Sequence, residues 1–274
     1  MGDNGRRDGG PPDLAVGEIA PGVYVATAEK YMTTTTIVAG RDGGCLLIDP
    51  AVTVADLSAL ARWLSERGLL PVAGWSTHPH WDHLLWSRAL GDAPRYTTPH
   101  AVAVAARAEA SLIAAVEEGA PGHDLRLFAR VQPLIGREID WPGPRALIYA
   151  HDAHAPGHGA VFLPDSGVLV VGDMCSDVEI PLLDLDSADP FGGYRAGLRL
   201  LADVPGVNVV VPGHGHVGDG TEFRRRIAAD RGYLDAVQAG ADTADPRLTE
   251  DWLRAEHARN LARAKACGGE RGGR

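Results

Sequence analysis

The run from Thr77 to His83, with the sequence THPHWDH, contains three histidines and one aspartate within six residues. Such a density does not suit a packed core, because each buried imidazole or carboxylate needs a hydrogen-bond partner. It does suit a metal site, and imidazole together with carboxylate favours zinc, iron or manganese over calcium or magnesium. The alternative interpretation is a surface loop that is rich in histidine, and polar residues further along the chain argue against it.

The spacing within this motif has a geometric meaning. The mostly apolar run of residues 71–76 predicts a buried strand, so the motif begins where a strand gives way to a loop. Alternate side chains of an extended chain point the same way, so His78 and His80 can reach one metal together. Asp82 and His83 follow a turn and are free to face a second metal nearby. Pro79 disfavours helix at His78, which excludes the helical His-Glu-x-x-His geometry.

Three further polar residues follow strand-like apolar runs: His158, Asp173 and His214. Glycines flank all three, and glycine lets the backbone turn sharply and approach a site closely. Any one of them alone would indicate a turn or a helix cap. Together with the motif at residues 78–83, they predict loops that gather at one edge of a sheet to build a site.

At these residues the sequence resembles the metallo-β-lactamase superfamily, and more closely its glyoxalase II-like hydrolase branch, over residues 17–220. The resemblance rests on His-x-His-x-Asp-His at 78–83, Pro-Gly-His at 156–158, Gly-Asp at 172–173 and Pro-Gly-His-Gly at 212–215. It implies that His78, His80 and His158 hold one metal, that Asp82, His83 and His214 hold a second, and that Asp173 bridges the two. It also implies that Asp49 is structural and supports the metal loop.

The fold that the resemblance implies is α/β (α+β), a four-layer αββα sandwich, with two Zn²⁺ ions as cofactors, or iron or manganese in their place. The activity implied is that of a zinc-dependent metallo-hydrolase, in which a metal-bridging hydroxide attacks the carbonyl of a small-molecule ester, thioester or lactone. Asp82 would be both metal ligand and proton acceptor. Three alternatives stay open: an iron-dependent sulfur dioxygenase with a single redox metal, a phosphodiesterase or nuclease of the same superfamily, and a metal-stabilised binding module.

Several residues depart from the family pattern. Asp173 has no counterpart in the true β-lactamases of the superfamily, which counts against antibiotic hydrolysis as the native role. Leu84 stands where glycine is usual, and Ser176 stands where similar acyl-homoserine lactonases carry a tyrosine. We expect the substrate pocket to involve the residues beside the ligands: Trp81, Leu84, Trp86, His154 and Cys175. We expect His151, His154 and His216 to support the ligands rather than to bind metal.

Composition limits the range of partners. The chain has 274 residues and a formal net charge of −10, which disfavours nucleic-acid binding because phosphate contacts need clustered Lys and Arg. Its three cysteines form no CxxC pair, which suits a reducing cytoplasm better than a disulfide framework. We expect neither a membrane-spanning segment nor a secretory signal, because no apolar stretch has the length of a span and none follows the charges at the start of the sequence. The expected partner is a small-molecule substrate, with neither nucleic acid nor membrane, and a homodimer stays open.

Along the chain we expect a disordered tail at residues 1–13, a single domain at 14–267 and a flexible tail at 268–274. Strands are predicted at 23–26, 34–38, 45–48 and 168–171. A helix is predicted at 54–67, which Thr53 and Asp56 cap. A helical insertion at 99–137, with one helix over 101–118, is expected to wall the pocket. An acidic loop follows at 176–194, and helices at 222–237 and 249–266 complete the domain.

Overall fold

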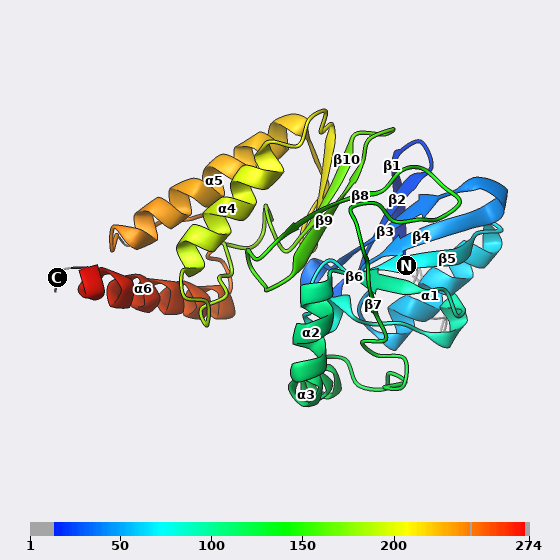
Figure 1. The fold of residues 1–274 in the computed structure, drawn as a ribbon, viewed down its shortest axis with the longest axis horizontal. Helices are drawn as coiled ribbons and strands as arrows, with labels where there is room; N and C mark the ends of the chain where they lie inside the picture. The colour runs from blue at the N-terminus through cyan, green and yellow to red at the C-terminus, as the bar shows by residue number, and fades with distance from the viewer. Residues whose placement is uncertain (1–13, 242, 272–274) are drawn as a thin grey trace, which may run out of the picture.

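The computed structural model of the chain describes residues 14–241 and 243–271. The tail predicted at residues 1–13 lies outside the described residues, as do the last three residues of the tail predicted at 268–274. Figure 1 shows two sheets at the centre of the molecule with helices on either side.

The first sheet has seven strands among the described residues, and they follow one another in chain order. They are β1 (Ala15–Ala20), β2 (Val23–Thr27), β3 (Thr34–Ala39), β4 (Gly44–Ile48), β5 (Leu70–Trp75), β6 (Arg95–Thr97) and β7 (Gln132–Pro133). The first four pair antiparallel, and β4 to β7 pair parallel. Helix α1 (Val54–Glu66) connects β4 to β5, as a parallel pair requires.

The second sheet contains five strands in the part of the chain described, in the order β12-β11-β10-β9-β8. They are β8 (Leu147–His151), β9 (His158–Leu163), β10 (Val168–Gly172), β11 (Val209–Pro212) and β12 (Gly218–Asp219). Strands β9 and β10 form an antiparallel pair, and β10 pairs parallel with β11 after helix α4 (Pro190–Ala202). This repeats the order of β3, β4, α1 and β5, so the two halves of the chain share a topology.

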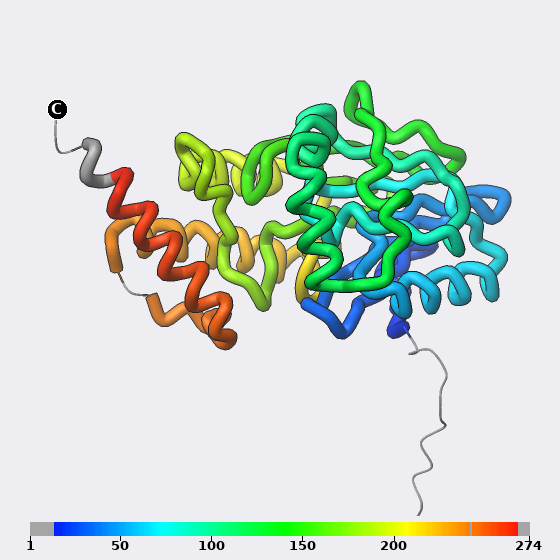
Figure 2. The backbone as a smooth tube through the Cα atoms, turned by 90° about the horizontal axis from the view of Figure 1, so that it is seen from below, coloured from blue at the N-terminus to red at the C-terminus, as the bar shows by residue number. Residues whose placement is uncertain are grey.

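Three apolar cores separate four layers. One lies between the first sheet and α1, α2 (Pro99–Arg107) and α3 (Glu109–Gly119), and a second lies between the two sheets. The third lies between the second sheet and α4, α5 (Gly220–Gln238) and α6 (Asp251–Arg271). Helix α6 packs on α5 at the end of the molecule away from α1, as the red and orange tubes of Figure 2 show. This is the predicted αββα sandwich.

The central strands supply side chains to two cores at once, because successive side chains of a strand face opposite ways. In β4, Cys45 and Leu47 enter the core under α1, while Leu46 and Ile48 enter the core between the sheets. Strand β10 divides its residues in the same way between the second and third cores. Strands buried on both faces read as continuous apolar runs, which explains why they were recognisable in the sequence.

The structure corrects several predicted boundaries. The helix predicted over 101–118 is two helices, α2 and α3, which are bent by 79° relative to each other. The acidic loop predicted at 176–194 ends at Asp189, whose side chain caps α4 by accepting a hydrogen bond from Gly192. Helix α6 runs to Arg271, into the segment predicted as a flexible tail. Thr53 and Asp56 form the predicted capping box at the start of α1.

No single described helix combines the length and hydropathy of a membrane span, although α2 and α3 taken together pass that test by composition.

Candidate metal centre

The histidine motif follows β5 directly, and a buried carboxylate from the neighbouring strand fixes its course. Asp49, at the end of β4, is 2% exposed and has a left-handed backbone with a φ of 49°. Its Oδ1 accepts a hydrogen bond from Thr77 N (2.8 Å) and its Oδ2 accepts one from Thr77 Oγ1 (2.6 Å). The same Oδ2 lies 3.0 Å from His83 Nδ1. Asp49 therefore holds both ends of the motif and has the supporting role that the resemblance implied.

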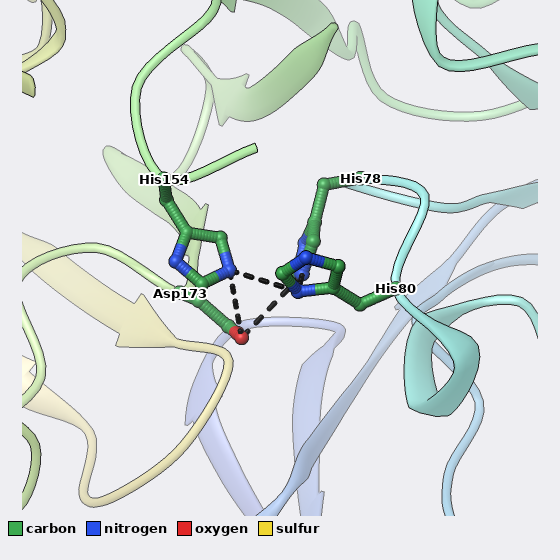
Figure 3. A group of neighbouring side chains, drawn as sticks. All are labelled: His78, His80, His154 and Asp173. Atoms are coloured by element: carbon green, nitrogen blue, oxygen red, sulfur yellow. Dashed lines mark hydrogen bonds and ion pairs between the residues drawn. The ribbon is translucent and has the colours of Figure 1, made fainter. Parts of the chain in front are cut away.

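A first group of donor atoms converges at the start of the motif, and Figure 3 shows its four side chains pointing toward one another. His80 Nδ1 lies 3.0 Å from both His78 Nε2 and His154 Nε2. Asp173 Oδ2 lies 3.4 Å from each of the same two Nε2 atoms. Four donors this close together can hold one metal ion.

A second group consists of Asp82, His83 and His214. His214 Nε2 lies 3.4 Å from His83 Nε2 and 3.3 Å from Asp82 Oδ2. Asp173 also faces this group, with its Oδ2 3.3 Å from His214 Nε2 and its Oδ1 3.2 Å from His83 Nε2. In the described part of the chain, that Oδ1 is buried without a hydrogen bond. The carboxylate of Asp173 thus lies between the two groups, where a bridging ligand would stand.

The outer nitrogens of the imidazoles show which atoms face the site. His154 Nδ1 lies 3.0 Å from the carbonyl oxygen of Leu182, and His214 Nδ1 lies 3.0 Å from that of Tyr31. A carbonyl oxygen only accepts, so each Nδ1 carries a proton, and Nε2 is the ring nitrogen that is left to face a metal. His78 is fixed in the same way, because Thr77 Oγ1 donates to Asp49 and so accepts from His78 Nδ1, 3.0 Å away.

Nε2 atoms and carboxylate oxygens that face one another in this way are arranged to receive a cation between them. Outer hydrogen bonds that fix the tautomer are also the usual support of metal-binding histidines. The donor set therefore fits divalent metal ions, with nitrogen and carboxylate ligands of the kind that zinc accepts.

The electrostatics of the ligands lead to the same conclusion. Burial lowers the pKa of His80 to about 4 and that of His78 well below its usual value. Burial acts in the same direction at His83 and His214, but the Asp173 carboxylate outweighs it and raises the pKa of both imidazoles well above the usual value. Without metal, protons on these two rings therefore offset the buried carboxylates. A bound metal replaces those protons.

The structure corrects one predicted ligand, since His154 occupies the place expected for His158. His154 lies in the loop between β8 and β9, and its left-handed backbone, with a φ of 65°, turns the side chain toward His80. His158 is the first residue of β9 and is 0% exposed. Its ring stacks on those of His78 and His151, with centroids 5.0 and 4.5 Å away. His158 thus supports the ring of His78 from behind, whereas His154, expected to support the ligands, lies in the first donor group.

Three residues predicted to line the pocket lie in apolar cores instead. Leu84 and Trp86 pack in the core under α1, because the turn at Trp81–His83 directs the chain inward. Cys175 packs in the core against α4 and α5, and burial raises the pKa of its thiol well above the usual value. Trp81 does line the cavity, and its ring also packs against Gly119, at the end of α3.

The cavity above the donor groups has a volume of about 960 Å³. The loop that follows Asp173 and the first turns of α6 form its outer wall. The residues they contribute are Glu179, Leu182, Leu183, Asp184, Leu185, Asp186, Trp252, Glu256 and Arg259. The insertion at 99–137, predicted to wall the pocket, contributes no lining residue, because α2 and α3 cover the first sheet instead.

Hydrogen bonds hold this wall in place. Ser176 Oγ donates to the carbonyl oxygen of His214 (2.8 Å) and accepts from the backbone N–H groups of Val178 and Glu179. From α6, Asn260 Nδ2 donates to Pro181 O (3.0 Å) and Arg263 Nη2 donates to Ser187 O (3.0 Å). The sequence reasoning missed α6 as a pocket wall, since its sequence shows only a helix with a packing face.

The other histidines of the chain lie outside both groups. His151 stacks on His158, and His216 pairs with Asp177 at 2.8 Å on the exposed surface. His100 pairs with Asp152, His123 contacts the carbonyl oxygen of Val52, and His257 contacts the hydroxyl of Tyr233.

Comparisons with known proteins agree with this architecture. A family profile described as the metallo-beta-lactamase superfamily matches residues 29–214, more than half of the chain. A metallo-beta-lactamase family protein from Thermus thermophilus is 24% identical, with a TM-score of 0.66 over 92% of this chain and 95% of that one. A beta-lactamase domain protein from Burkholderia ambifaria is 20% identical, with a TM-score of 0.68 over 94% of this chain and 88% of that one.

A third structure comes from a different kind of enzyme, the stereoselective inverting sec-alkylsulfatase Pisa1 from Pseudomonas sp. It is 18% identical, with a TM-score of 0.67 over 92% of this chain and 49% of that one. A search of curated proteins with this sequence found no match. Likeness at these identities shows the fold, and one fold supports many reactions.

Proposed function

This chain belongs to the metallo-β-lactamase superfamily, and from that premise we propose that it is a dinuclear metal-dependent hydrolase of a small-molecule ester, thioester or lactone. The observation that carries the proposal is the position of Asp173. Its carboxylate faces His78 and His154 in one donor group and His83 and His214 in the other. A shared carboxylate between two donor groups supports a pair of metal ions rather than one.

We propose zinc as the native metal, because His and Asp donors in compact groups suit it, with iron or manganese as substitutes. His78, His80, His154 and Asp173 would hold one ion, and Asp82, His83, His214 and Asp173 would hold the other. Divalent metal ions bound there supply a water that ionises near neutral pH and a Lewis acid that polarises a carbonyl.

The chain's own residues would take the proton from the attacking water and surround the substrate carbonyl. Asp82 lines the cavity, and its Oδ2 lies 3.6 Å from His83 Nε2 and 3.3 Å from His214 Nε2. Asp82 would accept the proton of the attacking water and later return it to the leaving group. Trp81 and Tyr31 stand edge to face at the rim, with ring centroids 6.3 Å apart, and would shield the reacting carbonyl from bulk water.

Two other reactions of this superfamily receive less support. An iron-dependent sulfur dioxygenase needs one metal, and the second donor group would then have no purpose. Phosphodiester hydrolysis needs an anionic substrate to enter a cavity whose outer wall carries Glu179, Asp184, Asp186 and Glu256, against Arg259 as its basic residue. A glyoxalase II-like thioesterase stays within the proposal, because the bridging carboxylate agrees with that branch.

The proposal is tested by a hydrolysis panel on zinc-loaded protein, with chelator-stripped protein and His80→Ala as controls. The panel contains thioesters, lactones, aryl esters, a chromogenic cephalosporin and an aryl phosphodiester. We expect chelator-sensitive turnover of carbonyl substrates that is lost in His80→Ala. Turnover of the phosphodiester alone would contradict the proposal, and so would oxygen consumption by the iron-loaded protein on a persulfide with no turnover across the panel.

A further inference from the structure

Glu179 carries a buried carboxylate that the metal centre does not use. The residue is 8% exposed and lines the cavity. Its backbone N–H donates to Ser176 Oγ at 3.0 Å. In the described part of the chain, no hydrogen bond or ion pair reaches its carboxylate, and the residue belongs to neither donor group.

A carboxylate in this position has to be explained. Removing an ionised group from water is costly unless a partner meets it, and Lys or Arg normally supplies that partner. Burial raises the pKa of Glu179 to about 7, although the nearby imidazole of His214 acts to lower it. Cavities that bind small molecules place a few polar groups in this way, aimed at one group of the ligand.

The rest of the wall indicates which group that is. Asp184, Asp186 and Glu256 line the same cavity. Arg259 is the cation in this part of the wall, and its guanidinium is paired with Glu256. The side of the cavity beyond the donor groups is therefore negative overall, which favours a cation and opposes an anion.

Exposed aromatic rings add to this preference. Trp252 is 45% exposed and lines the cavity beside Tyr31, whose ring already has the Lys30 ammonium group 5.1 Å from its centroid. The faces of Trp and Tyr attract ammonium groups through the quadrupole of the ring. Acidic and aromatic side chains around one mouth are the usual means of binding an organic cation.

We propose that Glu179 determines the specificity of this site, by selecting carbonyl substrates that carry an ammonium group beyond the bond to be cleaved. The inference rests on the proposed hydrolase function and names its substrate class. The ammonium group would enter past Tyr31 and Trp252 and pair with the Glu179 carboxylate. The apolar part of the substrate would lie along Leu182.

The test uses sets of three aryl esters. Within a set the acyl chains have equal length and end in methyl, trimethylammonium or carboxylate, and the sets differ in chain length. A trimethylammonium group cannot bind a metal, so its effect reports the wall alone. For zinc-loaded wild type, we expect kcat/KM for the cationic ester to exceed that of the neutral ester by about tenfold or more, because a hydrogen-bonded or paired charge contributes that much. The anionic ester should fall below the neutral one.

Glu179→Gln keeps the shape of the side chain and removes its charge. We expect the ratio of cationic to neutral kcat/KM to fall about tenfold in this variant, mostly through KM. Asp186→Asn is the matched control, because it removes a charge from the exposed rim of the same cavity, where screening leaves little effect. Equal ratios in wild type and Glu179→Gln would overturn the proposal. Loss of bound zinc from Glu179→Gln would also overturn it, by making Glu179 a metal ligand.

A binding measurement separates this inference from the proposed function. If no ester is cleaved by the zinc-loaded protein, the hydrolase proposal fails, and calorimetry still tests the wall. Hexyltrimethylammonium should then bind the wild type about tenfold more tightly than it binds Glu179→Gln, while n-hexanol binds both alike. Equal affinities for the cation in both proteins would overturn the inference whatever the catalytic result.

Discussion

His154 Nε2 lies 3.0 Å from His80 Nδ1, although the two residues come from opposite halves of the chain and from different sheets. His80 follows β5, while His154 lies in the loop between β8 and β9. The first donor group therefore forms only when the two sheets are packed together. Metal binding in that group should stabilise the packing of the halves, because a ligand that binds only the folded state stabilises it.

The two candidate histidines of the β8–β9 region can be told apart by substitution. We expect His154→Ala to lower zinc affinity by two orders of magnitude or more, because it removes a direct ligand. His158→Phe keeps the aromatic stacking against His78 and His151 and should keep zinc affinity within about tenfold, at a cost of about 1–3 kcal/mol in stability. Competition with a chromogenic chelator measures both affinities. The reverse order would make His158 the ligand.

Asp49 should matter to stability and to metal binding at once. Asp49→Asn removes a buried charge. The backbone N–H and the hydroxyl of Thr77 then lose a charged acceptor, and His83 Nδ1 loses a charged neighbour. We expect the free energy of unfolding of the metal-free protein to fall by about 2–4 kcal/mol. Zinc affinity should fall by about 10- to 100-fold, as it does when groups behind metal ligands are changed. Unchanged zinc affinity would show that the second donor group is positioned without Asp49.

Zinc binding should strengthen with pH. In the metal-free protein the pKa values of His83 and His214 are raised, so their contribution to folding stability is fully present below about pH 6.5 and is lost as the pH rises through the raised values. Zinc replaces these protons. The difference in Tm between zinc-loaded and metal-free protein should therefore widen from pH 6 to pH 8, and calorimetry in buffers of different ionisation enthalpy should detect proton release. A difference that narrows with pH would contradict this assignment of protons.

The contacts between α6 and the acidic loop should affect substrate binding more than chemistry. Asn260→Ala removes the hydrogen bonds to Pro181 O and to the hydroxyl of Tyr233. We expect KM to rise several-fold with kcat within about threefold, because the wall loosens while the donor groups stay in place. Steady-state kinetics on the best ester of the panel measures both constants, and the zinc content should equal that of wild type. A fall in kcat alone would place this contact in the chemical step.

Much of the site could be predicted because its ligands follow apolar strands buried on both faces. The strands ending at Ile48, at Trp75 and at Gly172 have this pattern, and the residues after them form the donor groups or support them. The choice between His154 and His158 could not be made in the same way. The two residues lie four positions apart, and only the start of β9 at His158 decides which of them remains in the loop.

The cavity was harder to predict than the ligands. Leu84 and Trp86 follow the motif directly, but the turn at Trp81–His83 takes them into the core under α1. The actual wall comes from residues far away in the sequence, such as Glu179 and Trp252, whose positions depend on how α6 packs on α5. Local patterns carry no signal for such packing. The break between α2 and α3 at Ala108 was missed for a similar reason, since neither glycine nor proline marks it.

A titration of metal-free protein with Zn²⁺, following bound metal and ester hydrolysis in the same samples, tests the central claim most directly. The two donor groups, joined by Asp173, predict that the chain binds two zinc ions and that turnover reaches its maximum only when both are bound. Saturation of binding and turnover at a single equivalent would contradict the dinuclear site. Binding of two ions without hydrolysis of any carbonyl substrate would keep the metal centre and reject the function.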